Sequence, residues 1–260
     1  MRTHSSRVFP VVLFVLAAVS PVRAGYLNQT LEQAHLLFHS ATNKTMYAEA
    51  AQQYELLVEE EGIRNGHLFY TLGNSWFMAG DLGRAILNYR RAEHFLPDDA
   101  DLKHNLEAAR EARTDLIPEE RPHPLAAQLL SWHIHTKTSQ RWWWFAGCWS
   151  LFWAALLWLS KTNRKGARIV AGATGALCAA LLASLAADAV VRSRSEQGVI
   201  IAKEVMARKG DSIRYAPAFR EPLHSGTEFV TMERRDGWRQ IRLADGRTCW
   251  IPASAAAMVN

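Results

Sequence analysis

The sequence predicts a multi-domain membrane protein with an all-α region, a transmembrane helical hairpin and a small all-β domain. Three observations indicate this fold class. Apolar residues recur at helical spacing from Leu31 to about Ala112. Two apolar spans, 142–160 and 169–191, are each long enough to cross a hydrocarbon core of about 30 Å. After the second span, apolar and polar residues alternate as they do in strands.

Residues 1–24 have the pattern of a secretory signal peptide. Arg2 and Arg7 precede an apolar run, and Val22-Arg23-Ala24 supplies the small residues of a cleavage site. The apolar run from Val8 to Val19 is too short to span a bilayer. We therefore expect cleavage after Ala24 and export of the region that follows.

Residues 25–112 contain a helical repeat whose clearest unit is 66–99. Small residues let two antiparallel helices pack closely, large residues fill the space between them, and a proline ends the second helix. The positions concerned are Phe69, Leu72, Gly73, Trp76, Gly80, Ala85, Tyr89, Ala92 and Pro97. The unit resembles a tetratricopeptide repeat, and a weaker copy precedes it. The resemblance implies a short all-α solenoid, with 101–112 as its capping helix.

Residues 113–141 are expected to form a stiff connector, because Pro118, Pro122 and Pro124 interrupt helices, followed by a short helix on the membrane surface. Six of the ten tryptophans lie within 142–158, as in an aromatic belt, which favours membrane helices over a buried soluble pair. Small residues in the second span favour close packing against the first. Asp188, near the end of that span, is interpreted as a solvated helix end.

The expected loop 161–168 joins the two spans and carries four basic residues. Short loops rich in Lys and Arg stay in the cytoplasm. This rule and the signal peptide give the same topology, with both flanking domains outside the cytoplasm. The basic residues of the loop are Lys161, Arg164, Lys165 and Arg168.

Residues 196–260 are expected to form short strands. The expected strands lie at Val199 and Ile201, Glu228 to Met232, Trp238 to Leu243 and Thr248 to Ile251. Asp236-Gly237 and Asp245-Gly246 supply tight turns between them. Together with Gly226-Thr227 and Trp250-Ile251-Pro252 these residues look like a bacterial SH3 domain, which implies a small SH3-like barrel. Cys249 stands where that family commonly has glycine, and we interpret it as a packed or partly exposed thiol.

The order of these parts is similar to that of BatE proteins of bacterial aerotolerance operons. The stretches 98–106 and 115–118 also resemble that family. The resemblance implies a protein of the bacterial inner membrane, with both terminal domains facing the periplasm. It implies a role beside von Willebrand factor A membrane proteins and a MoxR-type ATPase, in stress tolerance or envelope maintenance. It supplies no catalytic residues.

The sequence argues against several other functions. It lacks the residue order of a hydrolase triad, a glycine-rich phosphate loop and the spacing of a metal site, so we expect neither an enzyme nor a cofactor. Acidic residues outnumber basic ones in 25–140 and basic residues outnumber acidic ones in 192–260. The basic residues form neither a stripe nor an RNA-binding motif, so we expect no nucleic-acid partner.

Two functions fit these parts. The first is a membrane-anchored, non-catalytic scaffold that binds other proteins. The alternative is an envelope protein that binds peptidoglycan through its SH3-like domain. Aromatic residues at repeat positions are expected to pack in the core, whereas Asn88 and Arg91 lie off those positions and are the better contact candidates. The candidate partner-binding residues are Asn74, Phe77, Asn88, Arg91, Tyr215 and Trp238.

Overall fold

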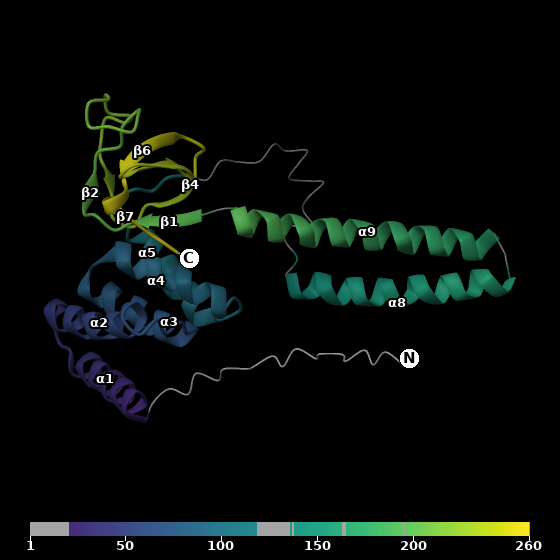
Figure 1. Ribbon diagram of the computed structural model, residues 1–260, viewed down its shortest axis with the longest axis horizontal. Helices are drawn as coiled ribbons and strands as arrows, with labels where there is room; N and C mark the ends of the chain where they lie inside the picture. The colour runs from purple at the N-terminus through teal and green to yellow at the C-terminus, as the bar shows by residue number, and fades with distance from the viewer. Residues whose placement is uncertain (1–20, 119–135, 137, 163–164, 195, 260) are drawn as a thin grey trace, which may run out of the picture.

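The computed structural model describes residues 21–118, 136, 138–162, 165–194 and 196–259. Figure 1 shows a helical region and a sheet that lie against each other, and a two-helix hairpin that extends away from both. We call these parts the helical region (21–112), the hairpin (138–194) and the β-region (196–259). The signal peptide expected at 1–24 lies outside the described residues up to residue 20, and Pro21–Ala24 begin the first helix.

The helical region contains five antiparallel helices. Four of them begin at Asn or Asp residues whose side chains accept a hydrogen bond from a backbone N–H of the first turn. These capping residues are Asn43, Asn65, Asp81 and Asp99. The helices are α1 (Pro21–Ser40), α2 (Lys44–Glu59), α3 (Gly66–Ala79), α4 (Leu82–Phe95) and α5 (Ala100–Glu111). The α3–α4 pair coincides with the predicted unit 66–99, and α5 with the expected capping helix.

Close packing between α3 and α4 depends on Gly73. A Cβ atom added at Gly73 would lie 2.5 Å from the ring of Tyr89, so a larger residue cannot fit without displacing that ring. Tyr89 and Trp76 are both buried, as the packing interpretation expects. Gly80 has a different role from the one expected. It ends α3 in the left-handed conformation (φ 88°), where glycine is favoured.

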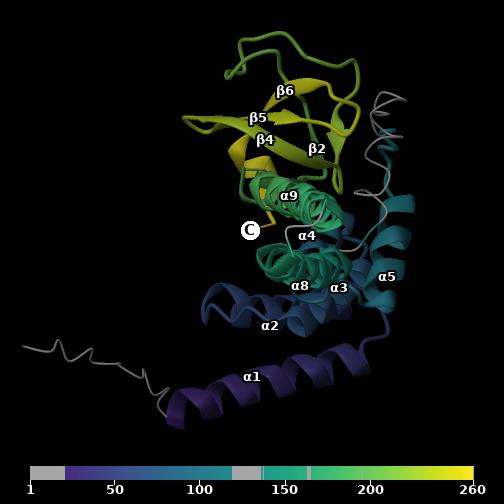
Figure 2. The same ribbon diagram turned by 90° about the vertical axis from the view of Figure 1, so that its right-hand side faces the viewer.

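The hairpin consists of α8 (Thr138–Thr162) and α9 (Lys165–Arg194), which pack antiparallel and lie side by side in both views (Figure 1 and Figure 2). Both helices are long and apolar enough to cross a membrane. They run further than predicted, and this shortens the expected loop 161–168. Lys161, Lys165 and Arg168 lie in helical end turns, because a helix satisfies its own backbone groups past the end of the apolar span. Arg164 and the surface helix expected at 125–134 lie outside the described residues.

The β-region contains a sheet with the strand order β6-β5-β4-β1-β7 and a separate β2–β3 ladder. All pairings are antiparallel. Gly237 and Gly246 have positive φ angles in the connections that flank β5, as expected for the two Asp-Gly turns. The strands are β1 (Glu196–Ile200), β2 (Glu204–Val205), β3 (Leu223–His224), β4 (Glu228–Arg235), β5 (Trp238–Arg242), β6 (Thr248–Pro252) and β7 (Ala256–Met258).

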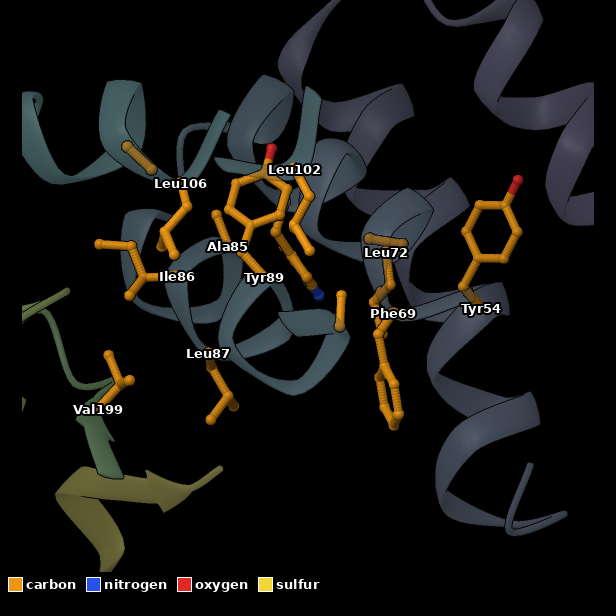
Figure 3. Close-up of a cluster of buried hydrophobic side chains, with 14 of the residues drawn as sticks. Tyr54, Phe69, Leu72, Ala85, Ile86, Leu87, Tyr89, Leu102, Leu106 and Val199 are labelled. Carbon is orange, nitrogen blue, oxygen red and sulfur yellow. The ribbon is translucent and has the colours of Figure 1, made fainter. Parts of the chain in front are cut away.

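One hydrophobic core extends from the helical region into the β-region. Val199 of β1 and Val259 after β7 belong to the same buried cluster as the side chains of α2–α5. Figure 3 shows Val199 beside Ile86 and Leu87 of α4. The two regions therefore form one packed body. A second cluster fills the β-region and includes Cys249, whose thiol is buried and has its pKa raised to about 12 by burial, so it stays protonated and unreactive.

Candidate interaction surfaces

Three arginines of the helical region and its C-terminal extension surround Glu228 of β4. Arg110 binds both carboxylate oxygens through Nε and Nη2, each at 2.9 Å. Arg113 Nη1 and Arg90 Nε each lie 3.3 Å from the carboxylate. Burial alone would raise the pKa of Glu228, but the hydrogen bonds from Arg110 and the three positive charges outweigh burial and lower it. The carboxylate is therefore ionised at neutral pH and holds the two regions together.

Asp115 makes a second polar contact between the two regions. Its Oδ2 accepts hydrogen bonds from the backbone N–H of His224 at 2.6 Å and from Thr227 Oγ1 at 2.9 Å. Its Oδ1 lies 2.8 Å from His224 Nδ1. Burial alone would raise the pKa of Asp115, but these hydrogen bonds lower it. Ile117 packs against the core of the β-region, so the segment after α5 contacts that region through Arg113, Asp115 and Ile117.

Helix α4 approaches the β-region closely at Gly83. A Cβ atom there would lie 2.4 Å from Ser225 Oγ and 2.7 Å from the carbonyl oxygen of Ile200. Gly83 therefore allows backbone-to-backbone approach between α4 and the end of β1. Near the other end of α4, Arg91 Nη2 donates a hydrogen bond to the carbonyl oxygen of Met258 at 3.0 Å.

This interface changes the interpretation of the two preferred contact residues. Asn88 is 1% exposed, and its Nδ2 donates to the carbonyl oxygen of Arg84 within the same helix. Arg91 contacts the β-region of its own chain. The premise that these two side chains are open to a partner is therefore wrong. Helix α4 packs against β1, and Arg91 is hydrogen-bonded to β7; the repeat pattern carries no signal of these long-range contacts.

The other predicted residues of the helical region lie on α3. Asn74 Oδ1 accepts hydrogen bonds from Tyr89 Oη at 2.8 Å and from Asn105 Nδ2 at 3.0 Å. Asn74 thus joins α3, α4 and α5 in one polar network. Phe77 is partly buried against the core, so neither side chain extends freely from the surface.

Tyr215 and Trp238 lie in different parts of the β-region. Tyr215 is half exposed in the long connection between β2 and β3. Trp238 begins β5, opposite Arg235 and Pro252. Arg235 links these parts, because it binds Asp211 of the same connection at 3.0 Å and lies 4.9 Å from the ring of buried Trp250. Arg235 was not identified in the sequence, and no local pattern marks it.

A largely apolar groove opens between α1, the α2–α3 connection and α3. It has a volume of about 380 Å³. Its polar lining includes His35, which is hydrogen-bonded to Tyr54 Oη at 3.0 Å. Sequence reasoning did not identify this groove. Its lining residues are Leu27, Asn28, Leu31, His35, Tyr54, Leu57, Ile63, Asn65, His67, Leu68 and Thr71.

The open end of the hairpin carries an ion pair that the sequence interpretation missed. Arg141 Nη2 of α8 lies 2.5 Å from Asp188 Oδ2 of α9, and Arg141 Nη1 donates to Ser184 Oγ at 2.7 Å. Thr138 Oγ1 also donates to Asp188. Asp188 therefore joins the two helices and is not simply a solvated end. The signal available in the sequence was an arginine that begins the first span opposite an acid that ends the second.

Within the residues that the structure describes, no three His, Cys, Asp or Glu side chains are grouped so that they could hold a metal ion. Comparisons with protein-family models, with curated proteins and with solved structures found no match.

Proposed function

We propose that this chain is a membrane-anchored, non-catalytic scaffold of the cell envelope that binds another protein through its helical region. The observation that carries the proposal is the open apolar groove between α1 and α3. The β-region covers the surface near Gly83 and Arg91 of α4. The α1–α3 side lies away from these contacts, and its groove is open and apolar. The hairpin supports the proposal, since both its helices are long and apolar enough to anchor the body to a membrane.

The groove suits a partner that presents apolar side chains. Leu27, Leu31 and Leu68 supply an apolar lining, and His35 and His67 add polar groups that can fix the orientation of a bound segment. We take the order of the helical region, the hairpin and the β-region to be that of BatE-like proteins. The proposed partners are von Willebrand factor A membrane proteins that act with a MoxR-type ATPase.

A pair of variants on α1 tests the proposal. Leu31 lines the groove and is 36% exposed, whereas Leu36 on the same helix is 69% exposed and is not among the groove residues. We expect Leu31→Glu to abolish co-purification of the intact protein with its von Willebrand factor A partner, because it buries a charge at the contact. Leu36→Glu is the matched control and should leave co-purification unchanged. Equal loss in both variants, or loss in neither, would contradict the proposal.

The alternative function is peptidoglycan binding through the β-region. The observation that favours it is the half-exposed ring of Tyr215 in the same connection as Asp211, which anchors Arg235. Arg208 Nη1 donates a hydrogen bond to the carbonyl oxygen of Tyr215 at 3.2 Å, so a basic side chain lies near this exposed ring. An aromatic ring near a basic group suits a polar ligand with apolar faces. Retention of the full chain on purified sacculi at high salt, lost in Tyr215→Ala, would favour this function. Retention lost at high salt in the unaltered chain would instead indicate weak charge attraction.

A further inference from the structure

A cavity of about 260 Å³ lies between the helical region and the β-region. One wall comes from α4, α5 and the segment that follows α5, and the other comes from β1, β4 and β5. The charged side chains among its lining residues are four arginines and one carboxylate. These are Arg90, Arg110, Arg113, Arg242 and Glu228.

The carboxylate of Glu228 cannot balance the charge of this cavity. It binds Arg110 through two hydrogen bonds and lies 3.3 Å from both Arg90 and Arg113. Arg90 is also paired with Glu93 outside the lining, and Glu107 lies 3.7 Å from Arg110 on the exposed side. The lining therefore carries a positive excess in a partly enclosed space, where it attracts anions more strongly than an open surface does.

Arg242 supplies a guanidinium group that this network leaves available. Arg242 lies directly opposite Val230 in the β4–β5 pair, and Val230 is two residues after Glu228. Alternation along strands therefore places Arg242 and Glu228 on the same face of the sheet. The structure, over the part of the chain it describes, gives the Arg242 side chain neither a hydrogen bond nor an ion pair.

The cavity lies close to the hairpin along the chain. Gln197 and Gly198 line it, and Arg194 is the last residue of α9. At about 3.4 Å per residue, an extended segment of this length covers only about 10 Å. A hairpin that crosses a membrane thus brings the cavity near the lipid headgroups.

We propose that this cavity binds a phosphate group, supplied by an anionic lipid headgroup or by a soluble phosphate. Guanidinium groups match phosphate oxygens with two parallel hydrogen bonds, and phosphate carries the extra negative charge that the cavity lacks. The volume is below the range of about 300–1,000 Å³ typical of drug-sized ligands, which fits a small anionic group. The bound phosphate would link α5 to β4 and β5.

The test uses the full chain in two kinds of nanodisc. In neutral phosphatidylcholine discs, inorganic phosphate in the millimolar range is compared with chloride at equal ionic strength. In a second arm, phosphatidylglycerol discs without added phosphate are compared with phosphatidylcholine discs. Hydrogen exchange of residues 110–113 and 228–230 is measured in both arms. Slower exchange with inorganic phosphate indicates the soluble source, and slower exchange with phosphatidylglycerol indicates the headgroup. Unchanged exchange in both arms overturns the proposal.

Two variants distinguish a specific site from general charge attraction. Arg242→Gln removes a cavity arginine. We expect it to weaken the affinity for phosphate or phosphatidylglycerol, measured from the slowing of hydrogen exchange, about tenfold, which is the size of one charge-assisted hydrogen bond. Arg214→Gln removes the same charge from an exposed position of the β2–β3 connection and should leave the effect unchanged. An equal loss in both variants overturns the proposal. Both variants should keep the unfolding midpoint of the parent, since neither guanidinium is bound to another described side chain.

Discussion

Glu228 shows how one side chain can hold two parts of a protein together. Its carboxylate leaves water on folding, which by itself is unfavourable, and three guanidinium groups compensate for that loss. Because Arg90 and Arg110 come from α4 and α5, the ion pairs form only when β4 lies against these helices. Removing the carboxylate alone would leave the arginines half-buried beside a neutral group.

We predict that Glu228→Gln lowers the free energy of unfolding by about 2 kcal/mol near neutral pH, because it breaks a largely buried, hydrogen-bonded ion pair. The folded-state pKa of Glu228 is lowered, so its contribution is complete above the unfolded pKa of about 4.3 and is lost as the pH falls through the folded value. The difference between variant and parent should therefore shrink in acid. Denaturant unfolding of the full chain in detergent at several pH values measures it.

The control for this prediction is Glu233→Gln on the same strand. Glu233 is more exposed and is paired with Arg235, so its replacement should change the free energy of unfolding by less than about 1 kcal/mol. Asp115 also has a lowered pKa and contributes in the same direction, so both variants keep part of the acid sensitivity. A Glu228→Gln difference that is the same at every pH would contradict the electrostatic explanation.

Helix α4 is packed closely against neighbours on two sides. One side packs on α3 through Gly73 and Tyr89, and Gly83 approaches the β-region. We predict that Gly83→Val separates the β-region from α4, because its side chain would overlap Ser225 and the backbone at Ile200. Overpacking of this kind costs about 1–3 kcal/mol.

Hydrogen exchange of β1 and of residues 113–117 measures this separation. His94→Val is the matched control, because it places the same β-branched residue at an exposed position of the same helix. Faster exchange is expected only in Gly83→Val. Equal acceleration in both variants would show that a β-branched residue in α4, and not the interface, is responsible.

Local patterns predicted the elements that depend on neighbouring residues. Helices α3 and α4 follow from the spacing of small and aromatic residues, and the turns around β5 follow from two Asp-Gly pairs. Strands β2, β3 and β7 were not predicted, because two or three residues are too few to show alternation. The contact of Glu228 with Arg110 joins residues far apart in the chain, so no periodicity marks it. The covered surface of α4 likewise depends on contacts between residues far apart in the chain.

For the whole molecule, the contact between the helical region and the β-region constrains the path of the chain. The hairpin lies between these two regions in the sequence, yet they share one hydrophobic core. If α8 and α9 cross a membrane, the start of α8 and the end of α9 must therefore lie on the same side of that membrane. This argument uses packing alone and is independent of the basic residues at the turn. The signal peptide pattern and those basic residues together predict that this side is the exterior.

Proteolysis of intact spheroplasts tests this topology. Arg64 in the α2–α3 connection and Arg214 in the β2–β3 connection are exposed trypsin sites, one in each region. We predict that added trypsin cuts at both sites in intact spheroplasts, whereas Lys161 and Lys165 at the turn are cut only after lysis. Arg64→Gln and Arg214→Gln each remove one of these trypsin sites. The cleavage product that disappears in each variant identifies the fragment made at that site. Cleavage in only one region would place the two regions on opposite sides of the membrane. The shared core would then be incompatible with a hairpin that crosses it twice.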